Sequence, residues 1–324
     1  MKYAVIPRTE MKVSRLCLGT MTFGAPVPAV EAIRLIQAAR EDFGINFVDT
    51  ANSYFGGQSE ICVGKALKGR RDRVILATKA GFKVGDGLNQ KGLSRSHVMQ
   101  QVEASLRRLD TDYIDIYFMH LPDHVTALED VLDTYNLLIE SGKIRYIGMS
   151  NFSAWECCEA LFTAKMRHQI GPAVTEMVYN LITRGIEQEF LPFVREHNLG
   201  LMTYNPLAGG ILSGRHHWDK QPPKDSRYGI LKSYAPRYWT QENFQSVEIL
   251  SALAADHDMT LVELAMRWCA MQKGVTSVIT GFSRESQLEQ NLASLEKGPL
   301  SQDILDACDA LWDQISGKRF SYNR

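Results

Sequence analysis

Short apolar segments alternate along the chain with longer segments in which apolar residues recur every three or four positions. The short segments are apolar on both faces, which is typical of buried parallel strands, and the longer ones are typical of amphipathic helices. The pattern predicts eight strands, the first of them preceded by a β-hairpin within residues 1–18. The strands are Leu16–Leu18, Asn46–Asp49, Val74–Thr78, Ile114–Met119, Ile144–Met149, Ala173–Met177, Gly200–Tyr204 and Ser277–Ile279.

Two helical stripes between these strands are especially regular. They consist of Val98, Val102, Leu106 and Leu109, and of Leu128, Val131, Leu132, Tyr135 and Leu138, the second ended by Gly142. Repeated strand–helix units predict a parallel sheet, either doubly wound or closed into a barrel. The GxGxxG fingerprint of dinucleotide-binding doubly wound sheets follows no early strand. Eight units therefore favour an α/β fold of the (β/α)8 TIM barrel type, formed by residues 1–324 as a single domain.

The alternation is interrupted after strand 7. Residues 205–239 are rich in glycine, proline and aromatic side chains and show no clear helical stripe. A loop of this length in a compact domain is usually functional or mobile, and the alternative is an ordinary surface excursion.

Composition limits the kinds of partner that we expect. The formal net charge is −1, so the chain as a whole has no attraction to nucleic acid or to an anionic membrane. No apolar run approaches a membrane span of roughly 20 residues, and no secretory leader is recognised. The six cysteines show neither CxxC nor zinc-ligand spacing, so we expect reduced thiols in a cytoplasmic protein. His216, His217 and Asp219 are too unspecific to indicate a metal site, and no metal is expected.

Four ionisable side chains end or follow three neighbouring strands. Asp49 ends the second strand and Tyr54 lies in the loop after it. Lys79 follows the third strand and His120 follows the fourth. Each of these residues alone is more often a packing, capping or solvated residue. Because the carboxyl ends of barrel strands meet at one rim, where the active sites of barrel enzymes lie, we expect the four side chains to converge there.

These residue types suit the reduction of a carbonyl group. Hydride addition leaves an oxyanion that needs a proton, and tyrosine is a neutral acid at pH 7. A Lys79 ammonium that is held and kept charged by Asp49 would stabilise the phenolate of Tyr54. A neutral His120 would donate a hydrogen bond to the carbonyl oxygen and orient it.

Several motifs, in the right order along the chain, resemble the aldo-keto reductase family. They are Gly44-Ile-Asn-Phe-Val-Asp49-Thr-Ala-Asn-Ser-Tyr54, Ser59-Glu60-Ile-Cys-Val-Gly64, Ala77-Thr-Lys79, Asp115-Ile-Tyr-Phe-Met-His120, Gly142-Lys-Ile-Arg-Tyr-Ile-Gly-Met-Ser150-Asn151-Phe152, Tyr204-Asn-Pro-Leu-Ala-Gly-Gly, and Gly281-Phe-Ser-Arg284 with Gln287-Leu-Glu-Gln-Asn291. The resemblance implies an oxidoreductase that interconverts an aldehyde or ketone and an alcohol with NADPH or NADP⁺. It also implies that Asp49, Tyr54, Lys79 and His120 are the catalytic residues, with Tyr54 as general acid and base.

The resemblance further implies where the cofactor binds. Ser150 and Asn151 would bind the nicotinamide carboxamide, and Tyr204 would stack on the ring. The glycine-rich segment after strand 7 would wrap the pyrophosphate, and the loop after strand 8 would hold the adenosine 2′-phosphate at a helix N-terminus. Arg284 makes NADPH a better fit than NADH, because a guanidinium recognises phosphate. The implied cofactor residues are Thr20, Met21, Asp49, Ser150, Asn151, Glu176, Tyr204, Asn205, Leu207, Gly209, Arg215, Gly281, Ser283, Arg284, Gln287, Gln290 and Asn291.

One position departs from the family's pattern. The family often has Gln at the end of the sixth strand, where this chain has Glu176. A carboxylate can accept a hydrogen bond from the carboxamide NH₂ but cannot donate one to its oxygen. Its negative charge would favour the oxidised, positively charged nicotinamide, so we expect a modest tilt toward NADP⁺ binding or alcohol oxidation.

The substrate pocket is expected at the same rim and is expected to take a small-molecule carbonyl or alcohol. The residues that would line it are Phe23, Tyr54, Phe55, Phe82, His120 and Leu121, although simple packing is an equal alternative for the apolar ones. Two other functions fit part of the pattern. Potassium-channel β subunits resemble this family and bind NADPH mainly as interaction proteins. A barrel aldolase would use Lys79 as a Schiff-base amine.

Overall fold

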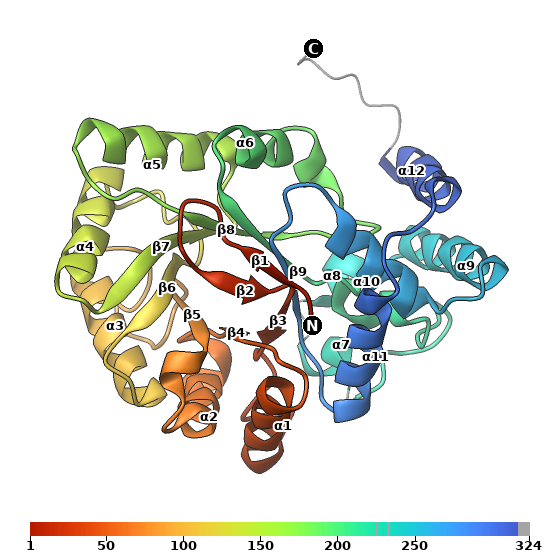
Figure 1. Ribbon diagram of the computed structural model, residues 1–324, viewed down its shortest axis with the longest axis horizontal. Coiled ribbons are helices and arrows are strands. Elements are labelled where there is room, and N and C mark those ends of the chain that lie inside the picture. The colour runs from red at the N-terminus through yellow and green to blue at the C-terminus, as the bar shows by residue number, and fades with distance from the viewer. Residues whose placement is uncertain (225, 232–233, 317–324) are drawn as a thin grey trace.

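Eight parallel strands close into a barrel in the order β10-β3-β4-β5-β6-β7-β8-β9 (Figure 1). The computed structural model describes residues 1–224, 226–231 and 234–316. The barrel strands are β3 (Leu16–Gly19), β4 (Phe47–Asp49), β5 (Ile75–Ala80), β6 (Ile114–Met119), β7 (Ile144–Ser150), β8 (Val174–Val178), β9 (Gly200–Tyr204) and β10 (Ser277–Thr280). The predicted barrel is confirmed, and the predicted strands differ from the observed ones by at most about two residues at each end.

The predicted N-terminal β-hairpin is present, and it lies across the N-terminal end of the barrel (Figure 1). Its strands β1 (Tyr3–Val5) and β2 (Lys12–Ser14) pair antiparallel. Ile6 and Met11, in the connection between the two strands, are buried against the side chains of the barrel interior. The close approach of the hairpin requires a glycine at the start of β9, because a Cβ on Gly200 would lie 2.6 Å from Cγ2 of Ile6.

Side chains fill the barrel interior. On β6, Ile116 and Phe118 belong to the interior cluster, whereas Tyr117 packs against the surrounding helices. Phe118 occupies space that Gly148 of β7 leaves free, since a Cβ on Gly148 would lie 2.4 Å from Cδ1 of Phe118. Full burial of such a side chain stabilises the fold by ~1.5–3 kcal/mol. The interior is therefore a packed core, as in other barrels of this type.

Helices surround the barrel (Figure 1). They are α1 (Ala29–Glu41), α2 (Gln58–Leu67), α3 (Arg95–Leu109), α4 (Leu128–Glu140), α5 (Ala154–Met166), α6 (Phe190–Glu196), α9 (Gln241–Asp256), α10 (Leu261–Met271), α11 (Glu285–Glu296) and α12 (Gln302–Ser316). The predicted stripe of α3 is wholly buried, and that of α4 is buried except for Leu128, which is half-buried against the core. Gly142 follows the C-terminal cap of α4 with a φ of 72°, a left-handed conformation that suits glycine.

The long segment after β9 contains short helical turns rather than a continuous loop. These are the 3-10 helix η4 (Ala208–Ser213), α7 (Arg227–Ile230) and α8 (Ala235–Tyr238). Aromatic side chains pack the described part of this segment together. The ring of Tyr228 lies 5.0 Å from that of Trp239 and 5.6 Å from that of His216, measured between centroids.

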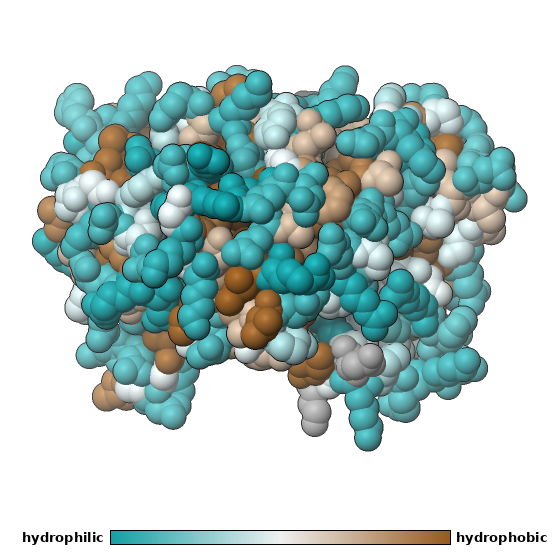
Figure 2. All heavy atoms as spheres, turned by 60° about the horizontal axis from the view of Figure 1, so that its bottom comes forward, coloured by the Kyte–Doolittle hydropathy of each residue, from teal (hydrophilic) through white to brown (hydrophobic). Residues whose placement is uncertain are grey.

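Hydrophilic side chains cover most of the face seen in Figure 2, and apolar ones form only small separate groups there. Helices that bury one stripe and expose the other produce such a surface. Within the described ranges, no helix is both long enough and apolar enough to traverse a bilayer. All six cysteines are free thiols, and only Cys158 is not fully buried.

The contact between α2 and α3 gives a direct test of the packing. A Cβ on Gly64 would lie 2.7 Å from the backbone oxygens of Arg108 and Leu109, which cannot move independently of their helix. We expect Gly64→Ala to lower the free energy of unfolding by ~1–3 kcal/mol, as overpacking does, in a urea titration. Gly185→Ala is the control, because a Cβ on Gly185 has no neighbour within 4 Å. Equal stability of the two variants would contradict the close contact.

Candidate active site

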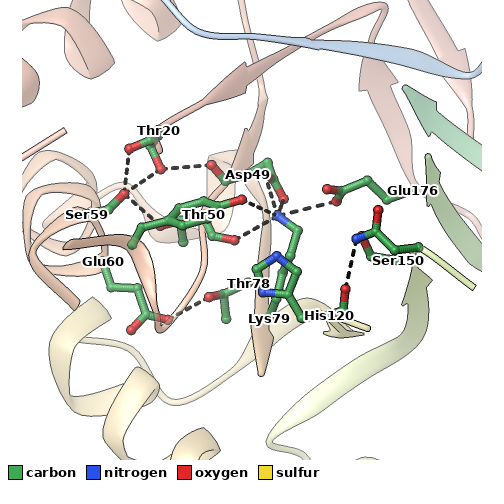
Figure 3. Close-up of polar contacts among 12 residues, drawn as sticks. Thr20, Asp49, Thr50, Ser59, Glu60, Thr78, Lys79, His120, Ser150 and Glu176 are labelled. Carbon is green, nitrogen blue, oxygen red and sulfur yellow. Dashed lines mark hydrogen bonds and ion pairs between the residues drawn. The ribbon is translucent and has the colours of Figure 1, made fainter. Parts of the chain in front are cut away.

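A buried ion pair lies at the C-terminal rim of the barrel, between β4 and β5 (Figure 3). Nζ of Lys79 lies 2.5 Å and 2.6 Å from the carboxylate oxygens of Asp49, and it donates to the carbonyl oxygen of Thr50 at 3.0 Å. Lys79 is fully buried and Asp49 is 2% exposed. Burial lowers the pKa of Lys79, but the charges of Asp49 and Glu176 raise it more, to well above the ordinary value. Lys79 therefore carries its positive charge in the protein interior.

Two residues at the start of α2 hold the backbone around this pair. Oγ of Ser59 lies 2.9 Å from Oγ1 of Thr50, within hydrogen-bond distance. The carboxylate of Glu60 accepts hydrogen bonds from Thr78 of β5 and from Arg108 of α3, each at 2.6 Å. The motif Ser59-Glu60 thus fixes the ends of the strands that carry the ion pair.

Tyr54 begins the short 3-10 helix η1 (Tyr54–Gly57), which follows the loop after β4. Its Oη accepts a hydrogen bond from Nζ of Lys79 at 3.5 Å. Burial raises the pKa of Tyr54 above its ordinary value, and the positive charge of Lys79 opposes this only in part. Lys79 lowers the pKa of Tyr54, as the sequence predicts, but the opposite effect of burial is larger. Tyr54 is therefore a neutral phenol that retains its proton.

His120 lies directly after β6 and is 6% exposed. Burial lowers its pKa well below the ordinary value, and the neighbouring charge of Lys79 lowers it further, so the imidazole is neutral. The ring packs edge-on against Phe82, with centroids 4.4 Å apart, and lies 5.9 Å from the ring of Tyr54. In the described part of the chain, Nδ1 of His120 has no hydrogen-bond partner. Because His120 also lines the cavity, its neutral imidazole can form a hydrogen bond with a polar ligand atom.

Glu176 of β8 approaches the Lys79 ammonium beside Asp49 (Figure 3). Its Oε2 is 3.4 Å from Nζ of Lys79, and its side chain is 5% exposed. Burial, followed by the charge of Asp49, raises the pKa of Glu176 to about 8 against the opposite effect of Lys79. Two carboxyl groups therefore face a single ammonium.

Asn151 connects the ends of three strands. It follows β7 with a left-handed φ of 64°. Its Nδ2 donates to the carbonyl oxygen of His120 and to Oγ of Ser150, both at 3.0 Å. Its Oδ1 accepts from the hydroxyl of Tyr204, at the end of β9, at 2.6 Å. The residues expected at the nicotinamide are thus neighbours at the rim.

A cavity of about 1420 Å³ opens at this rim and extends from Tyr54 to the first residues of α11. Most residues predicted for the site line it: Thr20, Met21, Asp49, Tyr54, Phe55, Phe82, His120, Leu121, Asn151, Glu176, Tyr204, Asn205, Leu207, Gly209, Arg215, Gly281, Ser283, Arg284, Gln287, Gln290 and Asn291. Lys79 and Ser150 are fully buried behind this lining. Phe23, expected in the substrate wall, is also fully buried and packs against Phe282 with ring centroids 6.2 Å apart. It is a core residue, because its strand-end position does not by itself turn the ring toward the cavity.

The far end of the cavity is basic. Arg284 lines this end directly before α11, where the partial positive charge of a helix N-terminus favours anions, and Arg215 also lines the cavity. Oε1 of Gln287 accepts from the backbone N–H of Ser283 at 2.8 Å, which holds the loop in place before the helix.

Two further arginines of the cavity, Arg227 and Arg237, are missed by the sequence reasoning. Arg227 of α7 donates to Oδ1 of Asn205 at 3.2 Å, and its guanidinium lies 5.4 Å from the centroid of Tyr234. The one signal of this helix in the sequence is Ser226, whose side chain caps α7 by accepting a hydrogen bond from a backbone N–H. A helix of four residues is too short to produce an apolar stripe, so the cap alone could not reveal it.

The residues present fit a dinucleotide. Gly209 and Gly210 line the cavity and have φ values of 71° and 113°, which suit glycine, so no side chain there separates the backbone from a ligand. Nδ2 of Asn205 is buried beside the cavity and, among the residues described, has no partner. Across the same residues there is no group of three or more His, Cys, Asp or Glu side chains placed to hold a metal ion.

Comparison with known proteins agrees with this geometry. The model of the Aldo/keto reductase family matches residues 15–313. The chain is 37% identical over 330 residues to a probable voltage-gated potassium channel subunit beta of Oryza sativa subsp. japonica, covering 99% of this chain and 100% of that protein. It is 34% identical over 324 residues to human aflatoxin B1 aldehyde reductase member 2, covering 95% of this chain and 89% of that protein.

A second human relative, aldo-keto reductase family 7 member A3, is 32% identical over 324 residues, with 95% of this chain and 96% of that protein covered. The relatives thus include proteins named as reductases and proteins named as channel subunits. The family match and the identities extend over nearly the whole length, through the barrel and its rim alike. This chain belongs to the aldo/keto reductase family.

Proposed function

We propose that the protein is an NADP(H)-dependent oxidoreductase that interconverts an aldehyde or ketone and the corresponding alcohol. The observation that carries the proposal is the convergence of Tyr54, Lys79, Asp49 and His120 at the mouth of a cavity large enough for a dinucleotide. Membership of the aldo/keto reductase family supports oxidoreductase activity. The proposal assigns a different chemical task to each of the four side chains.

Tyr54 supplies the proton to the substrate oxygen. The reduced nicotinamide, when bound, provides the hydride that the carbonyl carbon accepts. The resulting oxyanion takes the proton from Oη of Tyr54, and Lys79, 3.5 Å away, stabilises the phenolate that remains. Asp49 keeps Lys79 charged and in position through its two short contacts. In the alcohol direction the same phenolate accepts the proton back.

His120 orients the substrate. Its neutral ring can donate a hydrogen bond to the carbonyl oxygen without competing for the proton of Tyr54. Phe82 holds the ring edge-on, and Phe55 and Leu121 line the cavity beside it. These apolar walls suit the organic part of a small carbonyl compound.

The basic end of the cavity would hold the phosphates of NADPH. Arg284, Ser283 and Gln287 lie together at the start of α11, where the adenosine 2′-phosphate is expected. Arg227 adds a further guanidinium on the opposite segment. A guanidinium can bind a phosphate through two parallel hydrogen bonds, which NADH would not use at this position.

A second candidate function is that of an NADPH-binding interaction subunit. Relatives from Oryza sativa subsp. japonica and Arabidopsis thaliana, both named probable voltage-gated potassium channel subunit beta, are 37% identical to this chain. Such a protein would bind the cofactor in the same cavity but would need no turnover. Tight NADPH binding without turnover of any carbonyl or alcohol in a broad panel would favour this second function.

An aldolase that uses Lys79 as a Schiff-base amine is disfavoured. A nucleophilic amine must lose its proton and reach the substrate, whereas Nζ of Lys79 is fully buried and bonded to Asp49 and Thr50. Borohydride treatment in the presence of carbonyl substrates should leave Lys79 unmodified in a mass spectrum, and a trapped adduct would restore the aldolase hypothesis.

We expect Tyr54→Phe to lower the rate of carbonyl reduction by at least ~100-fold, because the ring remains but the general acid is lost. Absorbance of the reduced nicotinamide measures the rate, and fluorescence titration should give a Kd for NADPH within about twofold of wild type. Tyr146→Phe is the matched control, since it removes a hydroxyl that bonds to Glu10 away from the cavity lining. A near-normal rate for Tyr54→Phe would contradict the assignment.

We expect Arg284→Ala to weaken NADPH binding by roughly tenfold or more and NADH binding by much less, because hydrogen bonds to a charged phosphate contribute ~1.5–3 kcal/mol. Titration of both cofactors measures the two Kd values. Arg73→Ala removes an exposed arginine from the 3-10 helix η2 (Arg71–Arg73) and serves as the control. Equal losses for NADPH and NADH would argue against a 2′-phosphate site.

A further inference from the structure

Glu176 is a buried carboxyl group, and one of its two oxygens has no hydrogen-bond partner among the described residues. It lies on β8 opposite Ser150 of β7 and Met202 of β9, and it lines the cavity. Its Oε2 is 3.4 Å from Nζ of Lys79 and has no hydrogen-bond partner among the residues that the structure describes. Buried polar atoms are nearly always bonded, so an unpartnered carboxyl oxygen on a residue that lines a cavity suggests that the group binds a proton or a ligand.

The ammonium of Lys79 cannot neutralise Glu176 as well as Asp49. An ammonium has three N–H donors. Four oxygens already share these donors: both carboxylate oxygens of Asp49 and the carbonyl oxygen of Thr50 lie within 3.0 Å of Nζ (Figure 3), and Oη of Tyr54 lies at 3.5 Å. If both carboxyl groups were ionised, one buried negative charge would lack a counterion, which is unfavourable away from water.

Among the residues that the structure describes, no cation other than Lys79 forms an ion pair with Glu176. Burial raises the pKa of Cys17 on β3 and that of Tyr204 on β9, and Tyr54 keeps its phenolic proton for the same reason. His120, beyond Lys79, is neutral because burial lowers its pKa. Glu176, like these neighbours, is therefore stabilised in its uncharged form, in agreement with its pKa of about 8.

We propose that Glu176 is a proton-bearing positioning residue: its neutral carboxyl donates a hydrogen bond to the nicotinamide carboxamide, and its ionisation at alkaline pH places a negative charge beside the ring. This inference rests on the proposed NADP(H) function. A protonated carboxyl both donates and accepts, so it substitutes for the glutamine amide that the family often has at this position. The sequence predicts a preference for NADP⁺ over NADPH at any pH. On this proposal the preference appears only when Glu176 is ionised, so it depends on pH.

The sign of the effect on cofactor binding follows from charge. The neutral carboxyl interacts similarly with NADPH and NADP⁺, whereas the carboxylate favours the positively charged ring of NADP⁺. The ratio of the Kd for NADP⁺ to the Kd for NADPH should therefore fall as the pH rises through about 8. A fall of roughly tenfold corresponds to one unit of difference in the pKa of Glu176 between the two complexes.

The first experiment needs no cofactor and compares the melting temperatures of wild type and Glu176→Gln across pH. A carboxyl whose pKa is raised in the folded state destabilises the fold progressively as the pH rises from its unfolded pKa, near 4.5, to its folded pKa, about 8. Above that pH the loss of stability is constant. The glutamine variant lacks this penalty. Its melting temperature should equal that of wild type below about pH 4, exceed it increasingly as the pH rises, and keep a constant advantage above about pH 8.

The matched control is Glu60→Gln. Glu60 is as buried as Glu176, but its carboxylate is paired with Arg108 and Thr78, so its amide variant should be less stable than wild type at neutral pH. If Glu176→Gln were also less stable than wild type at neutral pH, Glu176 would be an ionised partner of Lys79 and the proposal would be overturned.

The second experiment titrates NADPH and NADP⁺ against wild type and Glu176→Gln between about pH 6.5 and 9.5. The Kd ratio should change with pH in wild type and stay constant in the variant. Calorimetry of wild type in buffers of different ionisation enthalpy should also show more proton release with NADP⁺ than with NADPH. A pH-independent ratio in wild type, with both cofactors bound, would overturn this inference alone, whereas failure of both to bind would overturn the proposed function with it.

Discussion

The ion pair of Asp49 and Lys79 imposes the arrangement of the groups around it. Two charges removed from water are unfavourable unless they lie close together and their remaining atoms are bonded. Here the ammonium has three oxygen contacts within 3.0 Å, and residues of α2 fix the strands that carry it. Further charge would be costly in the same volume, so Tyr54 and His120 are held neutral. The rim of the barrel thus combines one fixed charge pair with neutral groups that can exchange protons with a ligand.

Local sequence patterns were sufficient for the barrel and for most of its rim. The strands Ile114–Met119 and Gly200–Tyr204 match their predicted bounds, because a buried parallel strand is a short run of apolar residues wherever it occurs. Asp49, Lys79 and His120 could be brought together from sequence because the end of a parallel strand determines the side of the barrel on which a residue lies. Family motifs added the residues that we expect to bind the cofactor, most of which line the cavity.

Properties that depend on surroundings in space could not be obtained in this way. The acidity of Tyr54 is set mainly by burial, and the segments that bury it are distant in the chain. From the sequence alone Glu176 is expected to be charged, and only the structure shows that Glu176 and Asp49 approach the same ammonium. Arg227 reaches the cavity from a helix of four residues, too short to leave a periodic pattern. Phe23 follows a strand like its neighbours at the rim, yet packs into the core against Phe282.

Phe118 contacts both the packed interior of the barrel and the buried lysine at its rim. The ring fills space beside Gly148, and its centroid lies 5.8 Å from Nζ of Lys79. The hydrophobic core of the barrel is consequently also the surface on which the buried ammonium of Lys79 rests. The aromatic face of Phe118 attracts this ammonium weakly. Protein engineers who wish to change the surroundings of this lysine could reshape residues 118 and 148 together and leave every side chain of the cavity lining as it is.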